Sequence, residues 1–130
     1  MREILFRGKD VREQWHCGLL AHIGNAWFIS NKAGIATAIE VIPCTIGQYT
    51  GLTDKNGKKI FEGDIVAYCT SSNRATNKEF HEVVFETRGE SGYFGIKISK
   101  IETWGFCIEV PAKLMEVIGN IHDNPELLEA

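Results

Sequence analysis

The chain has 130 residues, of which 44% are hydrophobic and 24% charged. This composition is typical of one globular domain that buries a core without disulfides or metals. Acidic residues outnumber basic ones, 17 to 14, whereas proteins that bind the phosphate backbone of nucleic acids usually carry a basic excess. The charge balance therefore disfavours generic DNA binding.

The sequence also disfavours membrane and secreted proteins. No run reaches the roughly 20 apolar residues that a membrane-spanning helix needs. The N-terminus does not resemble a signal peptide, because Glu3 and Arg7 interrupt its short apolar stretch. We therefore expect a cytoplasmic protein with no membrane partner.

The four cysteines, Cys17, Cys44, Cys69 and Cys107, are widely spaced and form no C-x-x-C pair. In a reducing cytoplasm such residues remain thiols. Because a cysteine thiol behaves as a small hydrophobic side chain, we expect four free thiols that mostly fill the core.

Short apolar segments separated by turn residues make up the first third of the chain. In the second of them Trp15, Cys17 and Leu19 alternate and should share one face of a strand. Gly24-Asn25 is a typical turn dipeptide. The pattern predicts strands at residues 4–7, 15–20, 27–29 and 39–42.

The middle of the chain is rich in turn signals. Asn56-Gly57 favours a tight reversal, because both residues tolerate positive φ. Asp54 can close the same turn by accepting a hydrogen bond from the backbone two residues later. A second turn is expected at Gly63, from which a strand should leave over residues 65–68.

In the second half a polar segment, residues 70–78, reads as an exposed loop. Alternating apolar residues then predict strands at 83–85, 94–98, 104–110 and 117–121, of which 94–98 and 104–110 could pair. Asn124 and Pro125 suit the N-cap and first position of a short C-terminal helix. Leu127 and Leu128 would pin that helix to the body.

This succession of short strands without a long amphipathic helix predicts a barrel or a sandwich. Three ordered motifs make the prediction more specific. The opening residues 1–7, the central segment 46–66 with its Ile-Gly-Gln-Tyr-Thr-Gly-Leu and Ile-Phe-Glu-Gly-Asp-Ile-Val runs, and the closing residues 117–128 resemble the YopX family of phages and prophages.

The resemblance implies a single domain over residues 1–130, mainly β, built as a β-roll with an SH3-like, partly open barrel and a short C-terminal helix. It implies no established catalytic residues and no cofactor. Two features depart from the family pattern: Gly8-Lys9-Asp10 follow the opening Phe-Arg where an aromatic residue is common, and Pro43-Cys44-Thr45 replace a polar lead-in. These departures should alter only the local surface.

Polar residues crowd the central segment and are the candidate binding residues: Gln48, Tyr49, Thr50, Asp54, Lys55, Glu62 and Asp64. A binding surface with Tyr49 as its aromatic anchor is one reading. The other reading is turn chemistry, which we favour for Asp54, Gly63 and Asp64 because each stands where a turn demands it.

Catalytic and metal sites are less well supported by the sequence. Glu62 and Asp64 could form a carboxylate pair, yet no neighbouring apolar pocket is evident to separate their pKa values. His16-Cys17 with His22, or Glu62 with Asp64, offer metal-ligand types, but His16 and His22 on one strand would lie about 20 Å apart. We expect no metal and no catalytic residue.

The sequence thus predicts a non-catalytic module that contacts a host or phage protein, and exposed strand edges leave self-association open. A nucleic-acid-binding accessory protein of phage replication or transcription is the alternative. It would use short runs of lysine, such as Lys58 and Lys59, beside aromatic rings on which bases could stack. The rings in question are Tyr49, Phe61, Tyr93 and Trp104.

Overall fold

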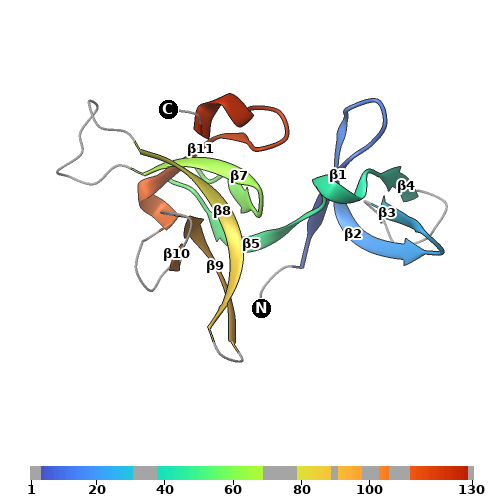
Figure 1. The fold of residues 1–130 in the computed structure, drawn as a ribbon, viewed down its shortest axis with the longest axis horizontal. Helices are drawn as coiled ribbons and strands as arrows, with labels where there is room; N and C mark the ends of the chain where they lie inside the picture. The colour runs from blue at the N-terminus through green and yellow to red at the C-terminus, as the bar shows by residue number, and fades with distance from the viewer. Residues whose placement is uncertain are drawn as a thin grey trace. The chain divides into compact units, whose positions relative to one another are not determined.

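A computed structural model describes residues 4–30, 38–68, 79–88, 91–97, 103–105 and 112–128. In these residues the chain is mainly β, with short 3-10 turns and no α-helix (Figure 1). No helix of the described part is long and apolar enough to cross a membrane. The chain divides into two compact units, residues 1–51 and 52–130, and each is described by itself.

The first unit is an antiparallel sheet of short strands in the order β4-β3-β2-β1-β5. The strands predicted in this part are confirmed, and β2 is longer than expected, because alternation continues to the turn at Gly24-Asn25. The bounds are β1 Phe6–Lys9, β2 Trp15–Ile23, β3 Ala26–Ser30, β4 Ala38–Val41, the 3-10 turn η2 Pro43–Thr45, and β5 Gly47–Thr53.

The sheet of the first unit curls until β4 approaches β1, although two strands separate them in the sheet order. The Ile42 N–H donates to the Lys9 carbonyl at 2.8 Å. A Cβ on Gly8 would lie 2.9 Å from the Val41 Cβ and 3.2 Å from the Ile29 Cδ1. The expected partly open barrel is confirmed: the curled sheet does not close. Gly8, a departure from the family pattern, is buried and not on the surface.

The second unit holds a five-stranded antiparallel sheet in the order β10-β9-β8-β7-β11, while β6 lies beside the end of β5. Its buried core consists of Ile60, Val66, Val83, Phe94, Ile96 and Met115, with Leu52 and Val117 packed against them. The bounds are β6 Lys59–Phe61, β7 Asp64–Tyr68, β8 Glu79–Arg88, β9 Ser91–Lys97, β10 Thr103–Gly105, the 3-10 turn η3 Ala112–Leu114, and β11 Met115–Asn120.

The predicted pairing of the 94–98 and 104–110 segments is confirmed, with Thr103 opposite Lys97 and Gly105 opposite Gly95. The described pair is shorter than predicted, since residues 98 and 106–110 lie outside the described part. The predicted loop at 70–78 and the cysteines Cys69 and Cys107 lie outside it as well.

The predicted short C-terminal helix is found at the expected place, with Pro125 as its first residue. Residues Pro125–Leu128 form only a 3-10 turn, η4. The Asn124 side-chain oxygen accepts from the Asn120 N–H at 3.3 Å and so points back toward β11. Leu127 is half-buried, but Leu128 is exposed, so only one of the two leucines contributes much packing.

The expectation that the cysteines mostly fill the core is wrong for the two that are described. Cys17 and Cys44 are thiols, as predicted, but both are exposed. The reason for Cys17 is the two-residue period of β2, which turns Gly18 inward and Cys17 outward.

Candidate functional site

Asp54 organises the centre of the second unit. Its Oδ1 accepts from the N–H groups of Asn56 and Lys58 at 2.8 and 2.9 Å, and its Oδ2 accepts from the Val117 N–H at 2.9 Å. Burial by itself would raise the pKa of Asp54, but these three amides and the Lys58 charge hold the pKa below its ordinary value. The predicted turn role of Asp54 is confirmed, with an added bridge to β11.

Asp64 has a similar role one turn later. It is only 2% exposed, and its Oδ2 accepts from the Phe61 N–H at 2.7 Å across the β6–β7 turn. Gly63, within that turn, donates its N–H to the Val83 carbonyl and accepts from the Ile121 N–H, both at 2.9 Å. The predicted turn at Gly63 is confirmed, and it is fastened to β8 and to the end of β11.

The other residues of the central segment differ in their accessibility. Tyr49 and Thr50 are buried, at 7% and 4% exposure. Gln48 is half-buried opposite Phe6. Lys55 lies 3.6 Å from Glu116 at the surface. The accessible polar groups are thus Gln48 in the first unit and Lys55 and Glu62 in the second, and their role in binding stays a prediction.

The two carboxylates considered from sequence as a pair, Glu62 and Asp64, have different surroundings. Asp64 is turned to the Phe61 amide, whereas Glu62 interacts electrostatically with Glu82 on β8. Burial raises the pKa of Glu82, Lys97 lowers it, and the Glu62 charge raises it again. Such a group is a partly desolvated surface carboxylate between charges of both signs.

The histidines considered as metal ligands have other neighbours. His16 contacts Asp10, and the His22 ring stacks on Trp27 with ring centroids 3.9 Å apart and parallel planes. Within the described ranges, no three His, Cys, Asp or Glu side chains come together as metal ligands. Of the four rings named in the nucleic-acid hypothesis, Tyr49 and Phe61 are buried and could not stack on bases without rearrangement. Tyr93 is half-buried, and the side chain of Trp104 lies outside the described part.

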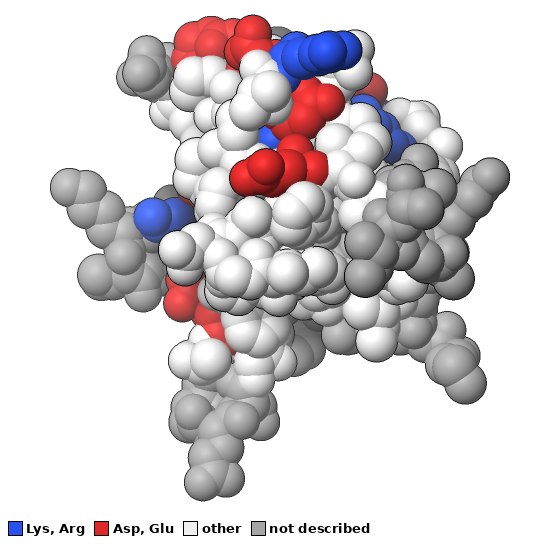
Figure 2. All heavy atoms as spheres, turned by 90° about the vertical axis from the view of Figure 1, so that its right-hand side faces the viewer, with Lys and Arg blue, Asp and Glu red and all other residues white. Residues whose placement is uncertain are grey.

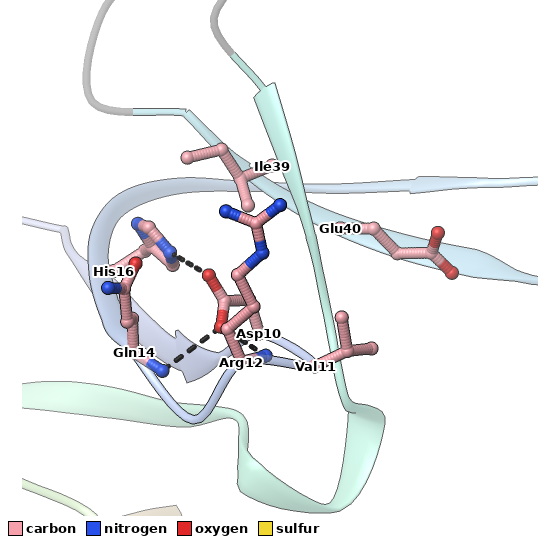
Figure 3. A pocket seen from close by; sticks show the side chains of 7 residues that line it. All are labelled: Asp10, Val11, Arg12, Gln14, His16, Ile39 and Glu40. Atoms are coloured by element: carbon pink, nitrogen blue, oxygen red, sulfur yellow. Dashed lines mark hydrogen bonds and ion pairs between the residues drawn. The ribbon is translucent and has the colours of Figure 1, made fainter.

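A pocket of about 350 Å³ lies in the first unit between the turn that follows β1 and strand β4 (Figure 3). Asp10 stands at its centre, 9% exposed. Its Oδ1 accepts from the Arg12 and Gln14 N–H groups at 2.8 and 3.0 Å, and its Oδ2 lies 2.7 Å from the His16 Nε2. Ile39 of β4 forms the opposite wall. One carboxylate thereby holds both the turn and the imidazole.

The bond to His16 is the main cause that lowers the pKa of Asp10, and the Gln14 and Arg12 amides act in the same direction against the effect of burial. Sequence reasoning missed this pair, because it treated His16 together with Cys17 and His22. The available signal was an Asp at the start of a turn, positioned to accept from amides two and four residues later.

A second feature of the first unit is the outer face of the β2–β3 hairpin, formed by Cys17, Leu19, Ala21 and Ile23 of β2 with Ala26, Phe28 and Ser30 of β3. Leu19 and Ile23 are 55% and 51% exposed. Figure 2, which views the side where β2, β3 and β4 lie, shows most of its charged side chains toward the top, a few at the left edge, and a broad uncharged area between them.

With this geometry described, the chain can be compared with known proteins. The family model described as YopX protein matches residues 8–129. The chain is similar to a solved structure, the crystal structure of protein EF1440 from Enterococcus faecalis, at 27% identity and a TM-score of 0.57. That likeness covers 98% of this chain and 99% of the other. No curated protein matches.

Proposed function

This chain belongs to the YopX family, and we propose that it is a non-catalytic protein-binding module of a phage or prophage, acting in the host cytoplasm. The observation that supports the proposal is the outer face of the β2–β3 hairpin. It presents large apolar side chains to solvent on a strand pair that contains no Asp, Glu, Lys or Arg.

The hairpin is unusual in its sequence. From Gln14 to Asn31 the chain contains no Asp, Glu, Lys or Arg. The cores of protein interfaces are depleted in charged residues, and contiguous exposed apolar patches commonly mark protein contacts. Leu19 and Ile23 each leave about half of their surface in water. Covering these side chains with a partner would release that water and favour binding.

The chemistry of the face also indicates the class of partner. A nucleic acid surface needs cations to pair with phosphates, and this face has none. A protein with an apolar patch of its own is the complementary partner. Rigid antiparallel strands suit such a contact, because little conformational entropy is lost when they bind.

The test places a photo-crosslinking amino acid at Leu19 or at Ile23 in phage-infected cells, followed by mass spectrometry of the adducts. Leu114 is the matched control, since it is 46% exposed but lies outside the hairpin. We expect a discrete protein adduct from both hairpin positions that survives nuclease, and none from Leu114.

The double variant Leu19→Lys with Ile23→Lys should abolish capture of the same partner, whereas Leu114→Lys should not. Equal adducts from all three positions would contradict the proposal. Adducts that disappear with nuclease would favour the nucleic-acid alternative. Turnover of a small substrate that is lost in Glu62→Gln would show an enzyme instead.

A further inference from the structure

We propose that the open edge of strand β4 binds an extended peptide segment of a partner protein, one that carries a lysine or arginine next to an apolar residue. The segment would add one antiparallel strand to the first sheet beside Ala38, Ile39 and Glu40. This site is separate from the outer face of the β2–β3 hairpin, so the inference does not rest on the proposed function. All residues that carry it belong to the first unit and to its described part.

Strand β4 turns the backbone groups of every second residue away from β3. Ile42, the extended residue that follows β4, donates its N–H to the Lys9 carbonyl at 2.8 Å. Backbone groups alternate between the two sides of a strand in an antiparallel ladder. Glu40 and Ala38 therefore turn their N–H and C=O groups to the same side as Ile42, away from their neighbours on β3.

The β2–β3 hairpin leads to the same assignment. Its two-residue turn joins a hydrogen-bonded pair, and alternation from that pair directs the backbone groups of Phe28 and Ser30 toward β2. Phe28 and Ser30 stand opposite Glu40 and Ala38 in the β3–β4 register. The backbone groups of Glu40 and Ala38 are therefore not used by β3.

Strand β1 covers this edge of β4 only as far as Ile42. It ends at Lys9, and Asp10 begins a turn in which its N–H donates to the Gln14 carbonyl at 3.0 Å. Within the described ranges β4 is the last strand in the order of its sheet, and no strand lies beside Glu40 on the open side. The pocket of about 350 Å³ lies there, between the turn and β4 (Figure 3). Unpaired backbone groups at an open edge are a template for a strand of another chain.

The side chains of β4 indicate which residues the segment carries. Residues directly opposite each other in an antiparallel pair project from the same face. Figure 3 shows Ile39 on the side of Arg12 and His16, and Glu40 on the other side of the strand. A cation opposite Glu40 would form an opposite-charge pair, since Glu40 is exposed and has no ion pair with any described residue. The next residue of the segment then lies beside Ile39 in the pocket, where an apolar side chain is the complementary one.

The charges around the edge favour a basic segment over a second copy of this chain. The Arg12 guanidinium lies on the Ile39 side of β4, so it does not compete for the Glu40 carboxylate. Because Arg12 is exposed, its side chain can move aside when the segment enters. In a second copy paired through its own β4 about Ile39, Ala38 would stand opposite Glu40. That arrangement provides no cation for the carboxylate.

The experiment titrates the full-length, isotopically labelled protein with the peptide acetyl-Lys-Val-Thr-Val-Thr-amide and follows backbone amides by NMR. The lysine is designed to stand opposite Glu40, the first valine opposite Ile39 and the first threonine opposite Ala38. We expect saturable shifts of the Ala38 and Glu40 amides, slower hydrogen exchange at both, and a Kd on the order of millimolar, as befits a fragment. The amides of Ile39 and Val41, which pair with β3, should keep their exchange rates.

Two N-methylated peptides test the backbone pairing. In the proposed register the N–H of the first threonine donates to the Ala38 carbonyl, whereas the N–H of the first valine points away from β4. Methylation of the threonine nitrogen should therefore abolish binding. Methylation of the valine nitrogen is the matched control and should leave the peptide able to bind.

Charge variants test the side-chain pairing. The peptide with glutamate in place of lysine should bind about twofold to fivefold more weakly, the range that a cross-strand charge pair implies. Glu40→Lys should reverse the order of the two peptides. Glu40→Pro removes the edge N–H but no bond to β3, so it should abolish binding in a folded protein. Glu40→Gln keeps that N–H and is its matched control, which should still bind.

Four results would each overturn the proposal: equal affinity for the lysine and glutamate peptides, undiminished binding of the peptide methylated at threonine, retained binding in a folded Glu40→Pro variant, or no response to millimolar peptide. A fifth concerns the free protein. Slow exchange of the Ala38 and Glu40 amides that disappears on dilution would mean that a second copy occupies the edge.

Discussion

Asp54 offers the clearest prediction at the scale of single residues. Its two carboxylate oxygens accept three backbone hydrogen bonds, two from its own turn and one from Val117. The amide side chain of the variant Asp54→Asn would have one acceptor oxygen and would turn its NH₂ group toward a backbone N–H. Because the side chain is 4% exposed, we expect a loss of about 2–4 kcal/mol in the free energy of unfolding, measured by urea denaturation at pH 7.

The same residue should make stability depend on pH. The pKa of Asp54 is lower in the folded chain than its ordinary value, so the folded state binds fewer protons than the unfolded state. Its contribution is therefore present above pH about 4 and is lost as pH falls through the folded pKa. The stability gap between wild type and Asp54→Asn should narrow at pH 3. A stability difference between wild type and Asp54→Asn that stays constant with pH would contradict this account. The control is Glu126→Gln, a change at an exposed carboxylate, compared with wild type at the same pH values.

A side-chain hydrogen bond could be predicted from the sequence only where both of its partners lie in the same turn. The Asp54 bond to Asn56 spans two residues and follows from turn chemistry, whereas its bond to Val117 spans 63 residues and needs the β11 register. Asp10 and His16 are only six residues apart, but their contact depends on the turn that joins β1 to β2. The alternation of His16 with Gly18 and Leu20 carried no signal of it.

At the scale of elements, the close approach of β1 and β4 predicts an unequal response of two glycines to alanine. In Gly8→Ala the new Cβ would meet the Val41 Cβ at 2.9 Å, which neither strand can relieve without shifting backbone. In Gly92→Ala the contact is the far end of the Phe85 ring, which is 47% exposed and can swing away. We expect a cost of about 1–3 kcal/mol for Gly8→Ala and a smaller cost for Gly92→Ala.

Urea midpoints of the two glycine variants, measured side by side with wild type, check this prediction. Equal midpoints would mean that β1 and β4 separate easily and that the curl of the first sheet is loose. A larger loss in Gly92→Ala would mean that Phe85 is held in place over β9 and contributes more to packing than its exposure indicates.

The strands themselves were largely predictable, because a period of two residues marks a face of a sheet wherever one side is buried. Phe94 and Ile96 are examples, and both belong to the core. The burial of Gly8 was not predictable, since it results from curling of the sheet, a long-range property. The C-terminal helix is shortened to a 3-10 turn for a related reason: the Asn124 side chain accepts from the Asn120 N–H, and this bond competes with capping.

The whole molecule raises the question of whether its two units unfold together. The sequence predicts a single domain over residues 1–130, and the division at residue 51 has no mark in composition. Strand β5 crosses that division: Gly47 and Gln48 pair with β1, and Leu52 packs on the core of the second unit. Gly51, the last residue of the first unit, has a φ of 89, a conformation that favours glycine.

A shared strand couples the two units, because unfolding of either one removes the partner against which half of β5 is ordered. We therefore expect one cooperative transition in urea, followed through the amides of Ile29 in the first unit and Val83 in the second, with a common midpoint. Gly8→Ala should lower the urea midpoints of Ile29 and Val83 by the same amount, although the change lies only in the first unit. Asp54→Asn, which lies only in the second unit, should likewise lower the two midpoints by the same amount. If Gly8→Ala lowered the midpoint of Ile29 and left that of Val83 in place, the units would be separate domains. In that case β5 would be a linker whose two halves are ordered independently.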